Sequence, residues 1–184
     1  GTGFFRLPAF PNHPPPREQI PFERFAIACL FGNDFPDILR NKRIMQRIYD
    51  ADFSFSNPPL KPILTAIPGD RKVYLLWDDQ AETSRDPVYG RDFEIYKIYR
   101  STDPNFSDIK TVTDAFGNAV LWKALAQFDK RDGLYGPHPI PLAGIGAVYD
   151  MGTDSGLRHS FVDTTVENGR TYYYAVVSVD KGFD

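Results

Sequence analysis

The hydrophobic pattern of this chain changes to a period of two residues after a proline-rich stretch, Asn57–Pro62 (NPPLKP). Each proline fixes its own φ and moves the preceding residue out of the helical region, so the stretch predicts an extended linker. Beyond it, apolar residues alternate in Lys72–Trp77, Phe93–Arg100 and Thr171–Val179. This is the period of strands with one buried face. Short strands joined by tight turns, with no helix between them, predict an antiparallel β-sandwich.

The segment before the linker predicts a different organisation. Two β-like runs, Gly3–Leu7 and Phe22–Phe31, flank a group of prolines. Two strands alone are marginally stable, so they need a sheet from another chain, from further sequence or from the following domain. Phe35–Tyr49 has apolar residues at helical spacing and a proline in its first turn, which predicts one amphipathic helix.

Composition limits the class of protein. With 184 residues, 42% of them hydrophobic, the chain is long enough for one domain and part of another. Its net charge of −3 gives no argument for a nucleic-acid partner. No apolar run is long enough to predict a membrane-spanning helix. The single cysteine, Cys29, cannot form an internal disulfide, and its apolar neighbours predict a buried position.

The region Pro58–Asp184 resembles a fibronectin type III domain. The resemblance lies in a second strand at 73–77 (VYLLW), a third at 96–100 (YKIYR) and a sixth at 169–178 (GRTYYYAVVS). Tyr172 matches the tyrosine corner of the family, whose hydroxyl bonds back to nearby backbone. The resemblance implies a two-layered sandwich with Trp77 and Tyr172 deep in its interior.

A second resemblance covers more of the chain. The helix, the string 49–53 (YDADF), the prolines, and the strings 77–79 (WDD) and 96–103 (YKIYRSTD) are together similar to large multidomain secreted or surface proteins of Gram-negative bacteria. This resemblance implies that residues 1–32 are terminal strands of a preceding β-domain and that 33–57 are a linker helix and connector. It also implies an extracellular or cell-surface location.

The chain departs from the type III pattern at two places. The stretch between the third strand and Ser160–Thr164 is roughly twice the expected length, which predicts an insertion at about 103–158. The chain also ends directly after the sixth strand, so we expect no seventh strand. That strand either lies in further sequence or is supplied by a partner chain or by residues 1–32. In the second case Tyr173, Ala175 and Val177 are the residues expected to contact the partner.

The insertion is rich in aromatic residues. We expect most of them to form a satellite core that holds the insertion down. The alternative is a sugar-binding platform or protein anchor made by Trp122 and Tyr135. The aromatic residues are Phe116, Trp122, Phe128, Tyr135 and Tyr149.

Carboxylates crowd two of the predicted loops. Oxygen-rich loops at one end of a sandwich favour solvated turns, with a calcium site as the alternative. No EF-hand spacing is present. The candidate calcium ligands are Asp78, Asp79, Asp103, Asn105 and Asp108.

The sequence contains no HExxH, GxSxG, Walker or GxGxxG motif. We therefore expect a non-enzymatic, β-rich module without a cofactor, acting in structure, adhesion or assembly through β-edge and loop contacts. Its partners would be other protein chains or flanking domains of the same polypeptide. The alternative is a carbohydrate-binding accessory module of a secreted hydrolase, with a glycan as ligand.

Overall fold

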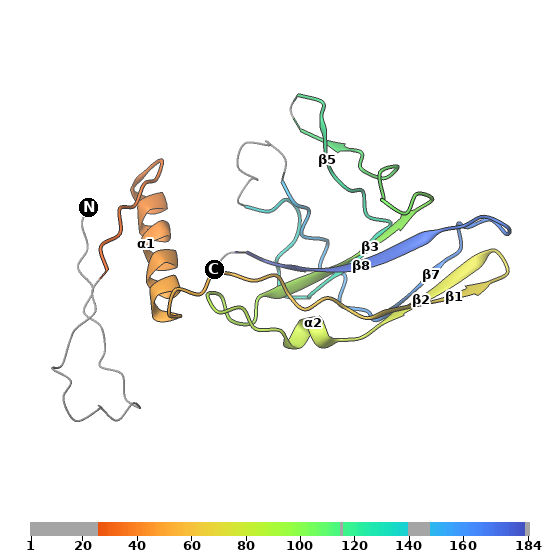
Figure 1. Ribbon diagram of the computed structural model, residues 1–184, viewed down its shortest axis with the longest axis horizontal. Coiled ribbons are helices and arrows are strands. Elements are labelled where there is room, and N and C mark those ends of the chain that lie inside the picture. The colour runs from red at the N-terminus through yellow and green to blue at the C-terminus, as the bar shows by residue number, and fades with distance from the viewer. Residues whose placement is uncertain (1–25, 115, 140–147, 183–184) are drawn as a thin grey trace. The chain divides into compact units, whose positions relative to one another are not determined.

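The computed structural model describes residues 26–114, 116–139 and 148–182 (Figure 1). The chain divides into two compact units, Gly1–Phe55 and Ser56–Asp184, so the division lies beside the prolines of the predicted linker. The described part is mostly β, with antiparallel strand pairs and two helices. This is the structural class that the periodicity predicts.

The first unit contains the predicted helix, α1 (Phe35–Asp50). The Asp34 side chain caps it by accepting a hydrogen bond from the Asp37 amide, and a proline occupies the first turn. The prediction of a helix over Phe35–Tyr49 is confirmed, with one further residue at its end. None of the described helices is both long and apolar enough to cross a membrane.

The two β-like runs before α1 are described only in part. Residues 26–32 form no strand, so the run 22–31 is wrong as a strand over its described residues. Gly3–Leu7 and residues 22–25 lie outside the described ranges. Cys29 is exposed, contrary to the prediction, because residues 26–32 form no element that buries its apolar side chains.

The second unit contains two three-stranded antiparallel sheets (Figure 1). In the first, β2 (Lys72–Trp77) lies between β1 (Leu64–Gly69) and β7 (Ser160–Asp163). In the second, β3 (Phe93–Ser101) lies between β6 (Ala126–Asp129) and β8 (Tyr173–Asp180). A short helix, α2 (Gln80–Thr83), follows β2, and β4 (Val112–Thr113) pairs with β5 (Ala119–Leu121).

One hydrophobic core joins the two sheets. Leu75 and Trp77 of β2 contribute to the same buried cluster as Tyr96 and Ile98 of β3 and Val176 of β8. The residues between them on each strand lie on the opposite faces, as the period of two requires. Leu75, Trp77, Tyr96 and Ile98 therefore follow the alternation of the sequence, whereas Phe93 of β3 also belongs to the core although it lies three residues before Tyr96.

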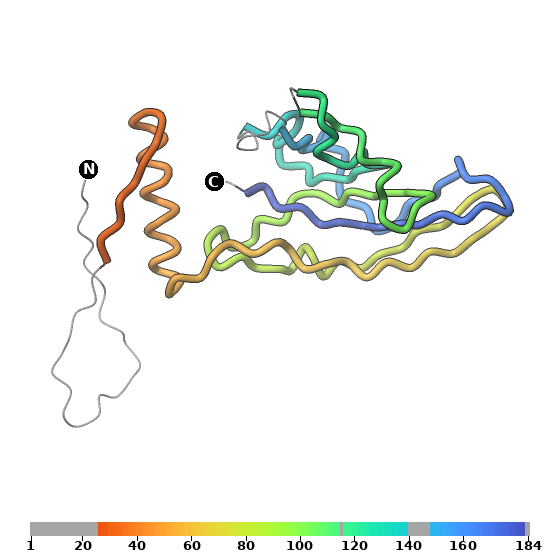
Figure 2. Tube along the Cα trace, turned by 45° about the horizontal axis from the view of Figure 1, so that its top comes forward, coloured from red at the N-terminus to blue at the C-terminus, as the bar shows by residue number. Residues whose placement is uncertain are grey.

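The predicted insertion is not one satellite unit. Its residues 126–129 form β6, which pairs with β3, and Phe128 belongs to the main core. Phe116, Trp122, Tyr135 and Tyr149 are all exposed, so the satellite core expected from these aromatics is wrong. Figure 2 shows the other described parts of the insertion on one side of the layer formed by β3 and β8.

Tyr172 is not deep in the interior. It directly precedes β8 and is half-buried, with the guanidinium carbons of Arg100 and Arg170 5.4 and 5.7 Å from its ring centroid. Its hydroxyl does bond back to nearby backbone, accepting a hydrogen bond of 3.1 Å from the Glu167 amide. Trp77, by contrast, is 5% exposed, as expected.

Candidate functional site

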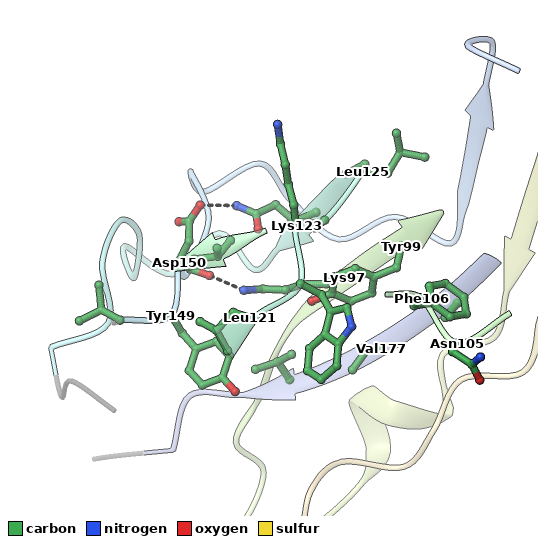
Figure 3. A pocket seen from close by; sticks show the side chains of 18 residues that line it. Lys97, Tyr99, Asn105, Phe106, Leu121, Lys123, Leu125, Tyr149, Asp150 and Val177 are labelled. Carbon is green, nitrogen blue, oxygen red and sulfur yellow. Dashed lines mark hydrogen bonds between the residues drawn. The ribbon is translucent and has the colours of Figure 1, made fainter. Parts of the chain in front are cut away.

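The sheet formed by β6, β3 and β8 has an inner face in the core and an outer face away from it. Lys97 and Tyr99 of β3 lie on the outer face, since Tyr96 and Ile98 belong to the core. A cavity of about 790 Å³, which we call the outer groove, lies on this face (Figure 3). Its lining is mostly apolar and comes from both the sheet and the insertion.

Strand residues form the floor of the outer groove, and two parts of the insertion form its walls. Lys97 and Tyr99 of β3, Ala126 and Gln127 of β6, and Ala175, Val177 and Val179 of β8 contribute to the floor. One wall contains residues from 105–112 and 121–125, and the other is Val148–Asp150. Because β8 is the last strand of its sheet among the described residues, the groove lies beside a sheet edge.

The wall at Val148–Asp150 is attached to the floor by polar contacts. Lys97 Nζ donates a hydrogen bond of 2.8 Å to the Asp150 carbonyl oxygen, and Gln127 Nε2 donates one of 2.9 Å to Asp150 Oδ2. These contacts bring the wall against β3 and β6 although the residues are distant in sequence. Figure 3 shows both bonds as dashed lines.

Asp129, at the end of β6, anchors the segment that follows this wall. It is fully buried and accepts hydrogen bonds from the amides of Asp154 and Ser155 and from the Ser155 hydroxyl. Burial alone would raise the pKa of Asp129, but these hydrogen bonds to its charged form together lower the pKa below its ordinary value.

The other wall begins where β3 ends. The Leu125 amide donates to the Ile98 carbonyl at 2.7 Å, and the Lys123 amide donates to the Ile109 carbonyl at 2.9 Å. Trp122, directly before Lys123, is 45% exposed, with Lys110 Nζ 5.2 Å from its ring centroid. This wall therefore presents an aromatic face and two lysines beside the groove.

The ionisable groups of the groove floor are desolvated. Burial lowers the pKa of Lys97 despite the nearby Asp150 carboxylate, and burial raises the pKa of Tyr99. Burial raises the pKa values of three carboxyl groups, Asp92 to about 6, Glu94 to about 7 and Asp180, and none of the three lines the outer groove. The strongest candidates for acid or base chemistry thus lie away from the cavity.

Three of the five predicted partner-binding residues meet at the outer groove. Trp122 lines one wall, and Ala175 and Val177 line the floor. Tyr173 lies on the same strand but outside the lining, and Tyr135 is exposed elsewhere on the insertion. Trp122 therefore lines the same cavity as residues of β8, whereas Tyr135 does not line it.

The predicted calcium ligands lie in two separate loops. Asp78 and Asp79 follow β2 and precede β3, whereas Asp103, Asn105 and Asp108 follow β3, so the nine-residue strand lies between the two groups. Within the described residues, no group of three or more histidine, cysteine, aspartate or glutamate side chains is placed to hold a metal ion.

The carboxylates of these loops accept hydrogen bonds from nearby backbone and hydroxyl groups. Asp78 Oδ1 accepts from the Ile63 amide, and Asp103 accepts from the amides of Asn105 and Ser107. Asp108 accepts from the hydroxyl and amide of Thr102 and from the Ser101 hydroxyl. These bonds lower the pKa values of Asp103 and Asp108, as expected for carboxylates that stabilise turns.

Lys97, Tyr99, Phe106 and Tyr149 line the outer groove without having been expected there from the sequence. The alternation of β3 does place Lys97 and Tyr99 on one face, which is a usable signal. Nothing in the local sequence indicates that Tyr149 would lie over that face.

A comparison with protein-family models, one with curated proteins and one with solved structures found no match. The outer groove and the strands around it therefore carry the functional proposal.

Proposed function

We propose that residues 56–184 form a fibronectin type III-like binding module of an extracellular multidomain protein. The module acts without catalysis, in structure, adhesion or assembly. It holds an extended segment of another protein chain along the free edge of β8 and in the adjoining outer groove.

The arrangement of strands supports the type III-like assignment. β2, β3 and β8 lie where the resemblance expects the second, third and sixth strands, and two antiparallel sheets enclose one core. The hydrogen bond from the Glu167 amide to the Tyr172 hydroxyl is of the kind expected for a tyrosine corner.

The single observation that carries the proposed function is the open edge of β8 beside an apolar cavity. Among the described residues, β8 has one ladder partner, β3, and Ser178 Oγ on its core-facing side donates to the Leu60 carbonyl at 2.9 Å. An unpaired strand edge is a template for another strand. The proposed ligand supplies that strand.

The groove gives this edge a means of selecting side chains. A strand paired with β8 would place alternate side chains about 5 Å from Ala175 and Val177, on the outer face. Val177 is 41% exposed, so it has apolar surface left to bury. Backbone hydrogen bonds would then give affinity, and the groove would give specificity.

The test uses the peptide acetyl-Thr-Val-Thr-Val-Thr-Val-Thr-amide, kept below its aggregation threshold, as a model strand. Added to the isotope-labelled chain, it should shift the amide resonances of β8 and of Ala126 and Gln127, while those of β1 stay unchanged. Val177→Asp should weaken its binding by about tenfold or more, since the aspartate places a charge in an apolar contact.

Val162→Asp is the matched control. Val162 is 42% exposed on the outward face of the other sheet, so the same change there should leave peptide binding unaltered. Shifts confined to the sheet of β2, or equal losses in both variants, would contradict the proposal.

A second candidate function is supported by the exposure of Trp122. An indole that is half exposed at a groove wall is suited to stacking on a sugar ring. A carbohydrate-binding module of a secreted hydrolase would bind oligosaccharides on a glycan array, and this binding would vanish in Trp122→Ala. Oligosaccharide binding together with failure of the peptide would replace the first function by this one.

A further inference from the structure

The floor of the outer groove contains a buried ammonium group. Lys97 is 6% exposed, and its Nζ lies 5.4 Å from the centroid of the Tyr149 ring. Figure 3 shows Lys97 reaching toward Asp150 along the floor. A lysine so far from water needs acceptors for its charge within the protein or from a ligand.

The ammonium group of Lys97 has more N–H donors than the protein offers it hydrogen-bond acceptors. An ammonium group has three N–H donors. Among the described residues, Lys97 Nζ has one hydrogen-bond acceptor, the Asp150 backbone carbonyl at 2.8 Å, and it makes no ion pair within 4 Å. Two donors are therefore available to a molecule in the groove.

The one carboxylate of the groove lining is already engaged. Asp150 Oδ2 accepts from Gln127 Nε2 at 2.9 Å, and Asp150 Oδ1 accepts from the Gly152 amide at 3.0 Å. These bonds hold the carboxylate in the wall, away from a direct contact with Lys97 Nζ. The buried cation of the floor thus has its charge only partly compensated.

Two further lysines lie beside the groove, whereas the Asp108 carboxylate of the same wall segment is engaged by Ser101 and Thr102. Lys123 is part of the lining, and Lys110 lies over the Trp122 ring. The chain as a whole has a net charge of −3, so this concentration of lysines is local. Charge complementarity therefore favours an anionic ligand over a neutral one.

We infer that the segment held in the outer groove carries an aspartate or glutamate whose carboxylate accepts hydrogen bonds from Lys97, between apolar residues that contact Val177 and Trp122. This inference rests on the proposed function and names the chemistry of its partner: an extended polypeptide with alternate apolar side chains and one acid among them. A charge-assisted hydrogen bond in a desolvated site is stronger than a neutral one.

The experiment compares two peptides that differ in one group. The central valine of the model strand is replaced by glutamate in one peptide and by glutamine in the other. The glutamate peptide should bind the chain at least about tenfold more tightly, the factor expected for a hydrogen bond to a charged group. The Lys97→Met variant should lose this preference and bind the two peptides with similar affinity.

Lys123→Met is the control for a general effect of positive charge, and it should keep most of the preference. A preference lost in Lys123→Met but kept in Lys97→Met would overturn the inference. Equal binding of both peptides would overturn it too, while leaving the proposed function intact. Failure of all three peptides to bind would count against the proposed function itself.

A measurement on the unaltered chain covers the case in which Lys97→Met fails to fold. The Lys97 side-chain resonance, followed against pH, should show a higher pKa with the glutamate peptide than with the glutamine peptide, because a carboxylate stabilises the ammonium form more than a neutral amide does. An unchanged titration with both would contradict the inference. Binding of a glucuronic acid oligosaccharide, with neither peptide binding, would assign the site to an acidic glycan.

Discussion

The inner and outer faces of the sheet formed by β6, β3 and β8 are built from alternate residues of the same strands, yet they differ in how they are covered. On the inner face, Tyr96 and Ile98 are fully buried against residues of the opposite sheet. On the outer face, Val177 and Trp122 keep much of their surface exposed around a cavity. The inner face is complete, and the outer face has room for a ligand.

The difference shows what alternation can and cannot determine. A period of two decides which side chains share a face, because successive side chains point in opposite directions. It does not decide what covers that face. The inner face is covered by a second sheet with the same pattern, whereas polar anchors such as Asp129 and Asp150 hold the insertion over the outer face.

The two tryptophans of the chain give the sharpest test of this contrast. Trp77 is buried, with its ring 6.2 Å from that of Phe128 and 5.9 Å from that of Tyr96. We expect Trp77→Ala to lower the free energy of unfolding by about 3–5 kcal/mol, because it leaves a cavity in the core. Trp122→Ala should lower it by less than about 1 kcal/mol. Urea unfolding followed by circular dichroism measures both without depending on tryptophan fluorescence.

Equal losses in the two variants would mean that Trp122 is packed as tightly as a core residue. The outer groove would then be part of the interior rather than a binding surface.

Asp163 tests how the two sheets are joined on the inner side. It is a buried residue of β7 that accepts hydrogen bonds from Arg100 Nη1 at 2.9 Å and from the Tyr174 hydroxyl at 2.8 Å, both in the other sheet. We expect Asp163→Ala to cost about 3 kcal/mol, since it leaves a partly buried guanidinium without its carboxylate. Chemical denaturation measures the loss. Tyr174→Phe, which removes one donor only, should cost about 1 kcal/mol.

Asp163 should also make the stability of the chain depend on pH in the acidic range. Burial alone would raise the pKa of Asp163, but bonds from Thr165, Tyr174 and Arg100 together lower it. Its contribution to stability is therefore present above the ordinary pKa of an aspartate and is lost as the pH falls through the lowered native value. A variant that loses stability equally at all pH values would contradict this role.

Strands with their own periodicity could be predicted from the sequence. β2 has the bounds of the predicted strand, and β3 is one residue longer than predicted. β6 has only four residues, AQFD, too few to show a period, and it exists because it pairs with β3. Its position inside the presumed insertion therefore could not be read from local sequence.

The candidate site could be predicted only in part. The outward face of β8 follows from the local pattern, whereas Trp122 is exposed although a satellite core is the first expectation for it. The wall over Lys97 depends on hydrogen bonds between residues 23 and 53 positions apart, from Gln127 and Lys97 to Asp150. Such pairings depend on the fold of the whole chain, and no local sequence motif predicts them.

Glu94 should make the free energy of unfolding depend on pH between about 5 and 7. It is 1% exposed, and burial together with the neighbouring Asp132 raises its pKa from 4.5 to about 7, although Lys130 opposes the shift. The unfolded chain releases this proton at lower pH than the native one, so the free energy of unfolding falls as the pH rises between the two values. We expect a fall of about 1–2 kcal/mol from pH 5 to pH 7.

Glu94→Gln should reduce this slope, as measured by denaturant unfolding at several pH values. The pKa of Asp92 is raised to about 6, so this residue also makes the free energy of unfolding fall as the pH rises. Adding Asp92→Asn to Glu94→Gln should therefore reduce the slope further. An unchanged slope in Glu94→Gln would mean that its carboxyl group is ionised in the native chain.

The smallest effect concerns the anchor that holds the cover of the outer face. Gly152 has a φ of 98°, and a Cβ added there would lie 2.6 Å from Asp129 Oδ2, whereas Gly136 has a φ of 79° and open space around it. Both alanine variants bear the cost of a positive φ, about 1 kcal/mol. Gly152→Ala must also displace the Asp129 carboxylate, so it should lose about 1 kcal/mol more and should speed hydrogen exchange at the Asp154 and Ser155 amides. Equal stability and equal exchange in the two variants would mean that apolar packing, and not the Asp129 hydrogen bonds, holds the insertion over the outer face. The inner and outer faces would then both be covered through apolar packing.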